Sequence, residues 1–396
     1  MVASHAEHFA ATQKVLDLAL VADLDRKERV LRGQWITPRV GPGQGMTSMR
    51  LLILGTGGMA AQHAKHFAAI EGVKLVGGVD VDPNRVEAFN NAHGIERGFG
   101  SLDAALAWGE FDAVANVTPD SIHHPTSIAA LKAGKHVFCE KPLATDYAKA
   151  LEMTETAERA GLVNMVNLTY RNVAELQKAR EIVTSGQIGA VKHVEASYLQ
   201  SWLVSKAWGD WRTESQWLWR LSKKHGSNGT LGDIGIHILD FASYGSGREI
   251  EHVFCRLKTF DKAEGNKIGE YELDANDSFT MAVDFDNGAL GVIHATRWAT
   301  GHFNELRLRV YGEKGGVEVQ HRHTGSQLRV CLGEDAETGT WKEMEVEPVP
   351  TNYQRFVEAI RTGKNLEPSF RHAANLQKVL DLATVTDRER REMPTH

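Results

Sequence analysis

The amino-acid sequence predicts two domains of the α/β class: a doubly wound parallel sheet, followed by an α+β domain with an open, mainly antiparallel sheet. The chain has 396 residues, of which 42% are hydrophobic, so it is too long for one ordinary core and apolar enough to fill two. From Arg50 onward, short apolar segments alternate with segments of helical periodicity, which is typical of βαβ units. After about Arg171 the segments become longer and alternate between apolar and polar residues.

The first half alternates predicted strands and helices in order. Residues 50–55 (RLLILG) predict a strand, a helix extends through Ile70, and residues 73–80 (VKLVGGVD) predict the next strand. Asp82-Pro83 opens another helix, because proline is favoured at the first helical position. Further strands are predicted at residues 111–117 (FDAVANV), 136–139 (HVFC) and 162–168. Since helical segments separate these strands, a parallel sheet is expected.

The second half is dominated by strands and hairpin turns. A helix ends at Gly186, and strands are predicted at residues 191–200 (VKHVEASYLQ), 278–285 (SFTMAVDF) and 290–298 (LGVIHATRW). The segments Asp286-Asn287-Gly288 and Lys314-Gly315-Gly316 have the composition of hairpin turns. An open sheet of this kind offers its uncovered face to a partner subunit, so a homodimer or homotetramer is expected.

The N-terminal region repeats part of the C-terminal helix. Residues 13–19 (QKVLDLA) recur at residues 377–383, and residues 36–49 are rich in proline and glycine, which indicates a flexible joint. The repeat is either an arm that packs like the terminal helix or, as we favour, an extension upstream of a natural start at Met46 or Met49. The predicted parts are therefore an extension of helix plus linker (1–48), a first domain (49–170) and a second domain (171–396).

Composition excludes several classes of function. The net charge of -6 does not favour binding to nucleic acid or to an anionic membrane. The sequence contains no uninterrupted apolar stretch long enough to predict a membrane span. Cys139, Cys255 and Cys331 lie far apart without CxxC spacing, which indicates a reducing compartment and a cytoplasmic protein. The adjacent His123 and His124 have no third ligand at a recognisable spacing, so no metal is expected.

A glycine-rich turn follows the first predicted strand and predicts a Rossmann-type dinucleotide site. The hexamer Gly55, Thr56, Gly57, Gly58, Met59, Ala60 has the pattern GxGxxA, which lets the backbone approach a pyrophosphate at a helix N-terminus. Asp80 ends the next strand, where its carboxylate can bind an unmodified ribose diol and would repel a 2'-phosphate. The pattern therefore predicts NAD, with NADP less favoured. Simple helix capping is the alternative for Asp80 and is the expected role of Asp82.

Two further motifs carry candidate catalytic residues. Lys141, within Glu140-Lys141-Pro142, follows a strand at the sheet edge where open α/β sheets bind ligands, although an exposed turn lysine is equally compatible with that position. Asp233 and His237 are four residues apart, so on a helix the carboxylate could orient the imidazole. A purely structural Asp and His pair is the alternative.

Taken together, these motifs resemble the glucose-fructose oxidoreductase, inositol dehydrogenase and rhizopine-catabolism (Gfo/Idh/MocA) family from about Met49 to the C-terminus. The markers are GTGGMA, TPDSIH at residues 118–123, Glu140-Lys141-Pro142, the turn SGQIG at residues 185–189, and GDIGIHILD at residues 232–240. The sequence departs from the usual pattern at Asp120 and in a long insertion between Tyr198 and Gly229.

The resemblance implies roles for individual residues. Lys141 and His237 would lie near the reacting carbon, with Asp233 hydrogen-bonded beside them. Four residues would line the cofactor: Thr118, Pro119, His123 and Glu140. Tyr170 and Arg171 occupy positions where the family often places substrate contacts, and His302 and Asn304 are weaker candidates.

The insertion is rich in aromatic residues. It holds Trp202, Trp208, Trp211, Trp217 and Trp219, interleaved with Arg212 and Arg220. Aromatic faces pack against the C–H faces of sugar rings, so we expect Trp208, Trp219 and Arg220 to contact substrate. A hydrophobic latch or a subunit contact is the alternative.

The expected function is an NAD-dependent dehydrogenase that oxidises a secondary hydroxyl of a sugar, an inositol-like polyol, an anhydro sugar or a glycoside to a ketone. His237 would accept the hydroxyl proton while Lys141 stabilises the developing charge, or Lys141 would itself be the base. The alternatives are a keto-sugar reductase, an NAD-dependent glycosidase and a noncatalytic NAD-binding regulator.

Overall fold

A computed structural model describes residues 48–396 of the chain. The predicted N-terminal extension, with its helix, linker and repeat, therefore lies outside the described residues apart from Ser48. Within residues 48–396, no helix has both the length and the apolar character needed to cross a membrane.

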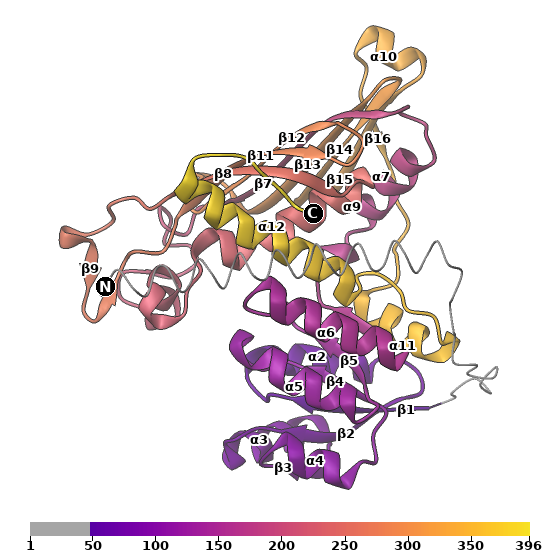
Figure 1. Cartoon of the computed structure of the whole chain (residues 1–396), viewed down its shortest axis with the longest axis vertical. Coiled ribbons are helices and arrows are strands. Elements are labelled where there is room, and N and C mark those ends of the chain that lie inside the picture. Colours follow the sequence, from indigo (N-terminus) through magenta and orange to yellow (C-terminus); the bar gives the residue numbers. More distant parts are fainter. Residues whose placement is uncertain (1–47) are drawn as a thin grey trace. The chain divides into compact units, whose positions relative to one another are not determined.

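The first sheet is parallel and contains six strands in the described chain, in the order β3-β2-β1-β4-β5-β6 (Figure 1). Its strands are β1 (Met49–Leu54), β2 (Val73–Val79), β3 (Arg97–Phe99), β4 (Ala113–Asn116), β5 (His136–Cys139) and β6 (Asn164–Val166). The helices between them are α2 (Gly58–Ala68), α3 (Pro83–His93), α4 (Leu102–Trp108), α5 (Asp120–Lys132) and α6 (Tyr147–Ala160). Strand order reverses between β1 and β4, and open α/β sheets bind ligands at the carboxyl ends of the strands at such a point.

The short strand β3 is absent from the sequence prediction. It contains only Arg97, Gly98 and Phe99 and lies at the edge of the sheet, so it lacks the apolar run that marks the central strands. Asp82 caps α3 by accepting a hydrogen bond from the backbone of Asn84 at 3.0 Å, with Pro83 at the first helical position, as the sequence predicts.

The second sheet has nine strands in the described residues, in the order β16-β15-β14-β13-β7-β12-β11-β8-β17. Its strands are β7 (Val191–Gln200), β8 (Ile250–Lys258), β11 (Ser278–Phe285), β12 (Leu290–Thr296), β13 (Phe303–Gly312), β14 (Gly315–Arg322), β15 (Gly325–Leu332), β16 (Lys342–Met344) and β17 (Met393–Pro394). Every pairing is antiparallel except that between β7 and β12. The predicted fold class, a Rossmann sheet followed by a mainly antiparallel α+β sheet, is confirmed.

The remaining elements connect the strands or cover them. The α-helices are α7 (Ala174–Thr184), α8 (Ser215–Leu218), α9 (Ile236–Ser246), α10 (Glu334–Thr338), α11 (Asn352–Thr362) and α12 (Phe370–Glu389). The 3-10 helices are η1 (Thr169–Asn172), η2 (Trp219–Leu221), η3 (Lys223–His225) and η5 (Glu264–Asn266), and η4 (Leu231–Gly235) is a turn of π-helix. The two short strands β9 (Lys267–Ile268) and β10 (Tyr271–Glu272) pair with each other.

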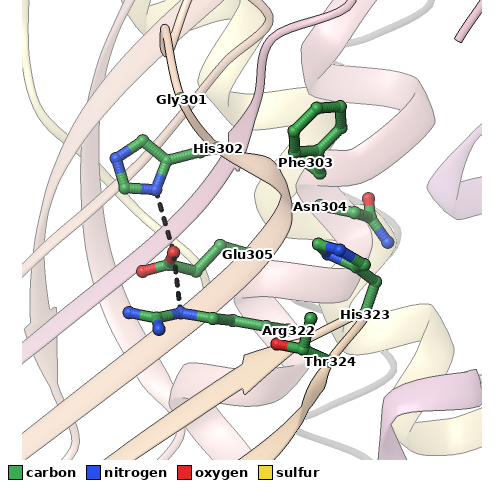
Figure 2. A pocket seen from close by; sticks show the side chains of 8 residues that line it. All are labelled: Gly301, His302, Phe303, Asn304, Glu305, Arg322, His323 and Thr324. Carbon is green, nitrogen blue, oxygen red and sulfur yellow. Dashed lines mark hydrogen bonds and ion pairs between the residues drawn. The ribbon is translucent and has the colours of Figure 1, made fainter. Parts of the chain in front are cut away.

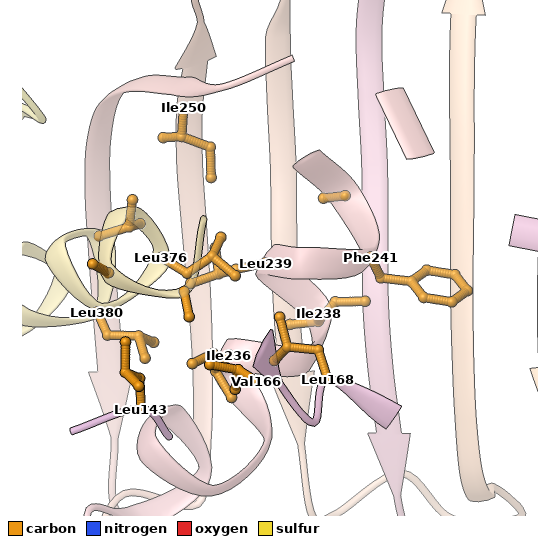
Figure 3. Packing of buried hydrophobic residues seen from close by; sticks show 14 of the residues in the cluster. Leu143, Val166, Leu168, Ile236, Ile238, Leu239, Phe241, Ile250, Leu376 and Leu380 are labelled. Carbon is orange, nitrogen blue, oxygen red and sulfur yellow. The ribbon is translucent and has the colours of Figure 1, made fainter. Parts of the chain in front are cut away.

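One apolar core continues from the first sheet to the second. Helices α7, α9 and α12 contact the second sheet, and α12 also packs on α6. Figure 3 shows Leu143 and Val166, which follow or belong to strands of the first sheet, beside Ile236 of α9 and Leu380 of α12. Since residues 48–395 belong to one compact unit, the domain boundary placed at residue 170 stays a prediction.

Candidate functional site

The turn between β1 and α2 is shaped for a ligand that binds the backbone. Gly55 has φ +88°, and a Cβ on it would lie 2.7 Å from the carbonyl oxygen of Val117, so no larger residue fits. Gly57 caps α2 without a side-chain hydrogen bond. A Cβ on Gly57 or Gly58 would meet no described atom within 4 Å. The turn thus leaves the N-terminus of α2 accessible to a pyrophosphate, which helix N–H groups bind well.

Asp80 organises this turn from the end of β2. Its Oδ2 accepts hydrogen bonds from the backbone N of Thr56 at 2.9 Å and from Thr56 Oγ1 at 3.0 Å, and its Oδ1 accepts one from Asp82 N at 3.1 Å. Burial alone would raise the pKa of Asp80, but these hydrogen bonds lower it. The carboxylate is therefore ionised beside the glycine turn, where Met59 is exposed and Ala60 is buried.

His123 lies beneath the carboxyl ends of β4 and β5, where it connects two loops. It is fully buried, and its ring nitrogens lie 2.8 Å from the carbonyl oxygens of Pro142 and Thr118. The expectation that its ring lines the cofactor is therefore wrong, because both polar atoms are bonded within the protein. Thr118 and Pro119 lie between β4 and α5, where Thr118 Oγ1 donates to Asn116 at 2.7 Å and Pro119 caps α5.

Glu140 also has a supporting place. Its Oε1 lies 2.7 Å from His63 Nε2 and accepts a hydrogen bond from Asn167 Nδ2 at 2.7 Å, and its Oε2 accepts one from the backbone N of Lys141 at 3.2 Å. Burial alone would raise the pKa of Glu140, but His63 and Asn167 lower it to about 2. These three donors fix the carboxylate, and the expectation that Glu140 lines the cofactor stays a prediction.

Lys141 follows β5 at the carboxyl edge of the first sheet, as the sequence predicts, and contacts the turn η4. Its ammonium donates a hydrogen bond to the backbone oxygen of Asp233 at 3.2 Å. The same nitrogen lies 3.7 Å from Asp233 Oδ1, and a quarter of the lysine side chain is exposed. The ammonium is thus held by η4 while its remaining hydrogens are available to a ligand.

Three cations surround the Asp233 carboxylate. Arg297 Nη2 donates to Asp233 Oδ2 at 2.8 Å, Arg220 Nε lies 3.8 Å from the same oxygen, and Lys141 lies on the Oδ1 side. Burial alone would raise the pKa of Asp233, but the charges of Lys141, Arg297 and Arg220 lower it to about 2. Asp233 is therefore an ionised counter-charge.

His237 is buried and neutral. Burial, together with the nearby positive charge of Lys141, lowers the pKa of His237 to about 3. Its Nδ1 is buried and bonds to no group in the described part of the chain. The expectation that the Asp233 carboxylate orients the His237 ring is wrong, because Asp233 lies in the π-helical turn η4 and its carboxylate accepts from Arg297 instead.

Two tyrosines and an asparagine form a closed hydrogen-bond ring beside His237. Tyr198 donates to Asn304 Oδ1 at 2.5 Å, Asn304 Nδ2 donates to the Tyr170 hydroxyl at 3.0 Å, and the two hydroxyls lie 2.5 Å apart. Tyr170 must then donate to Tyr198, since the Tyr198 hydrogen is already used. Because the Tyr170 hydrogen is used in this way, its hydroxyl can offer a substrate only a lone pair. The ring of Tyr170 packs edge-on against His237, with centroids 5.1 Å apart.

Asn304 holds this ring in a strained conformation. It has φ +119°, which residues with a side chain rarely adopt, and its Oδ1 also accepts from Gln200 at 2.9 Å. Strain of this kind persists only where surrounding contacts impose it, and it occurs often at functional sites.

Arg171 does not face the site. It is 1% exposed, and its guanidinium donates to Asp240 at 2.6 Å and 2.9 Å while lying 3.5 Å from the centroid of the Tyr244 ring. The expectation that Arg171 contacts substrate is wrong, because its side chain is buried in an ion pair that connects η1 with α9.

The tryptophans of the insertion divide into two groups. Trp202 and Trp211 are each 2% exposed and form an apolar cluster, as the latch interpretation requires. Trp208 packs partly buried against that cluster. Trp219 is 39% exposed, and the guanidinium of Arg220 lies 4.5 Å from its ring centroid. Trp219 and Arg220 thus extend the charged group around Asp233 toward solvent.

Arg297 is a site residue that the sequence analysis misses. It is fully buried, and besides Asp233 it binds the backbone oxygen of Arg220 at 3.1 Å. Arg297 follows directly after β12, and the sequence pattern there does not distinguish a buried arginine from one at the surface. Only the alternation of the strand, which directs every second side chain inward, could have indicated that Arg297 is buried. In the described chain, no three His, Cys, Asp or Glu side chains gather as metal ligands.

The sequence and the fold of the chain match those of known proteins. Residues 49–168 match a profile described as the oxidoreductase family with an NAD-binding Rossmann fold, and residues 176–318 match the GFO/IDH/MocA C-terminal domain. The chain is 30% identical to D-glucoside 3-dehydrogenase of Escherichia coli over 62% of this chain and 70% of that protein. It is 29% identical to levoglucosan dehydrogenase of Pseudarthrobacter phenanthrenivorans, over 55% of this chain and only 57% of that protein.

A solved structure agrees over a longer stretch. An oxidoreductase domain protein from Kribbella flavida superimposes with a TM-score of 0.78 and 29% identity, covering 88% of this chain and 100% of that one. The cofactor of the matched family is NAD, and the glycine turn and ionised Asp80 fit it. The chain therefore belongs to the Gfo/Idh/MocA family of oxidoreductases, as the resemblance of its motifs predicted.

Proposed function

We propose that the chain is an NAD-dependent dehydrogenase that oxidises a secondary hydroxyl group of a sugar or sugar-like polyol to a ketone. The observation that carries this proposal is the juxtaposition of a neutral His237 with the Lys141 ammonium at the carboxyl end of β5. A neutral imidazole can accept a proton, and an ammonium can stabilise a developing negative charge on the same oxygen.

The residues divide the work as follows. When bound along the turn from Gly55 to Ala60, NAD+ supplies the hydride acceptor. His237 takes the hydroxyl proton, while Lys141 donates a hydrogen bond to the substrate oxygen. Asp233 pairs with the lysine charge at 3.7 Å, which favours the donor role for Lys141 over that of base. Asp80 favours NAD over NADP, because its ionised carboxylate repels a 2'-phosphate.

The substrate class follows from the exposed part of the insertion. Trp219 provides an aromatic face, and Arg220 beside it can bind hydroxyl groups, which together suit the two kinds of surface on a sugar ring. The related D-glucoside 3-dehydrogenase and levoglucosan dehydrogenase are named for substrates of this kind. We therefore propose glycosides, anhydro sugars and inositols as the first compounds to test.

The test is NADH formation by the purified chain with NAD+ or NADP+ and a panel of these compounds. We expect NADH to appear in step with a ketone product. Replacing Lys141 with Met should lower kcat about 100-fold while NAD+ binding, followed by fluorescence, is retained. Lys178→Met on the exposed side of α7 is the matched control. Turnover by Lys141→Met close to that of the control would contradict the proposal, and cofactor returned unchanged with a cleaved glycoside would favour a glycosidase.

We also propose a homodimer or homotetramer formed through the uncovered face of the second sheet. Leu290 and Val292 on β12 are 52% and 43% exposed, which is unusual for aliphatic side chains in a strand. Light scattering of the purified chain measures its mass, and a monomer at micromolar concentration would contradict this assembly. A cytoplasmic location stays a prediction.

A further inference from the structure

A cavity of about 350 Å³ opens at the start of β13, beside the turn that joins β14 to β15. Figure 2 shows the side chains of His302 and Arg322 directed at Glu305 from opposite sides. The lining residues are Gly301, His302, Phe303, Asn304, Glu305, Arg322, His323 and Thr324. This volume is within the range of small-molecule sites.

Glu305 is the anchor of the cavity and has no capacity left for a ligand. It is 5% exposed, and its two oxygens accept four hydrogen bonds, from His302 Nδ1, Gln320 Nε2, Arg307 Nη2 and Arg322 Nε, at 2.9, 2.6, 3.1 and 3.2 Å. A carboxylate offers about four lone-pair directions, so these donors use them all. Two arginines also more than neutralise its charge.

The strongest hydrogen-bond donor that remains for a ligand is Arg322. It uses Nε on Glu305 and keeps the two terminal nitrogens of its guanidinium, on a side chain that is 48% exposed. His302 donates from Nδ1, which leaves Nε2 as an acceptor in the neutral ring, and His323 and the Thr324 hydroxyl can each donate or accept. Asn304 Oδ1 already receives Tyr198 and Gln200.

The excess positive charge decides the class of ligand, because two arginines share the single carboxylate of Glu305. An oxyanion presents only acceptors, and arginine binds carboxylate and phosphate oxygens in a fork geometry. The ring of Phe303, which is 36% exposed, supplies an apolar wall for the carbon skeleton that carries the anion.

We propose that this cavity is a binding site for a small-molecule oxyanion, a carboxylate or a phosphate monoester, held by Arg322, His323 and the Thr324 hydroxyl. It lies apart from the Lys141 ammonium, but its wall residue Asn304 bonds to Tyr170, which packs on His237. The anion is therefore bound one layer of side chains behind the proposed catalytic histidine.

The experiment is isothermal titration of the full chain with inorganic phosphate and with D-gluconate, with NAD+ present so that the glycine turn is occupied. We expect saturable binding of at least one anion. Arg322→Gln and His323→Asn should each weaken it about tenfold, as expected for the loss of one charge-assisted hydrogen bond. His323 makes no contact with Glu305, so its variant leaves the anchor intact. Arg329→Gln, on β15 outside the cavity, is the matched control.

The outcomes separate the sources of the anion and can overturn the site. Binding of phosphate alone identifies a phosphate monoester, and binding of gluconate alone identifies a sugar acid; either supports the proposal. Absence of saturable binding to the wild-type chain overturns it. So does an Arg329→Gln variant that loses as much affinity as Arg322→Gln, because the effect would then be general surface charge. Neither readout depends on turnover, so the dehydrogenase proposal stands or fails separately.

Discussion

Replacing Arg297 with Met tests whether a buried cation holds the centre of the site together. The guanidinium is fully buried, donates to Asp233 Oδ2 at 2.8 Å and to the backbone oxygen of Arg220 at 3.1 Å, and lies 4.8 Å from the Trp202 ring centroid. Methionine fills much of the volume but removes the charge and both hydrogen bonds. The Trp-rich insertion and the Asp233 carboxylate lose their common partner.

The size of the effect follows from what is left unpaired. Removing one partner of a fully buried ion pair costs about 3–5 kcal/mol. The Asp233 side chain is 30% exposed and keeps Lys141 and Arg220 nearby, so we expect the lower value of about 2–3 kcal/mol. In a chain of this size that corresponds to a fall of roughly 3–4 °C in the midpoint of thermal unfolding.

The assay is thermal unfolding followed by circular dichroism, with Arg329→Met as the control. Arg329 makes an exposed pair with Glu318, which should contribute less than about 1 kcal/mol. Arg297→Lys separates charge from geometry, because lysine keeps the charge but cannot bind both oxygens in a planar fork. If Arg297→Met unfolds at the same temperature as Arg329→Met, the reasoning about this buried pair is refuted.

Three further predictions can be checked in parallel. Burial raises the pKa of Asp381 to about 6, so the folded chain holds a proton there that the unfolded chain releases from about pH 4, and stability falls as pH rises from 4 through 6. Asp381→Asn should therefore raise the unfolding midpoint at pH 8 and change it little at pH 4. The new amide keeps a partner, because Gln377 Oε1 has none among the described residues and can accept from it. Equal shifts at both pH values would contradict this. Asp80→Asn should lower kcat/KM with NAD+ and raise it with NADP+, and an unchanged NAD+ to NADP+ ratio in steady-state assays would remove Asp80 from cofactor selection. His237→Asn should lower kcat about 10²–10⁴-fold without loss of NAD+ binding, whereas a fall in affinity alone, with kcat retained, would exclude the role of base.

Short motifs carried most of the sequence prediction. The glycine turn, Asp80 and Lys141 are local features at the ends of apolar strands, and a parallel sheet brings the ends of its strands to one edge. Their positions could be predicted because each depends on one strand and one turn. Strand β3 was missed, because three residues with a glycine do not form a recognisable pattern.

The predictions that failed concern the direction of side chains. His123 and Arg171 lie in the expected segments, but each is directed into the protein and bonded there. A motif states which residue follows a strand, and its partners in the folded chain decide whether its polar atoms are free; Asp240 lies 69 positions from Arg171. Asp233 shows the same limit, since a π-helical turn and Arg297 redirect its carboxylate away from His237.

The sequence by itself determined the two-sheet architecture, the dinucleotide turn, the family and the segments that hold the candidate catalytic residues, because these depend on local periodicity and turn chemistry. Only the tertiary structure decided that Asp233 is shared by Lys141, Arg297 and Arg220, that Asn304 joins Tyr170 to Tyr198, and that Glu305 anchors the cavity that Arg322 lines. Charge states and hydrogen-bond networks depend on burial and on contacts between segments far apart in the chain, and no local pattern in the sequence records them.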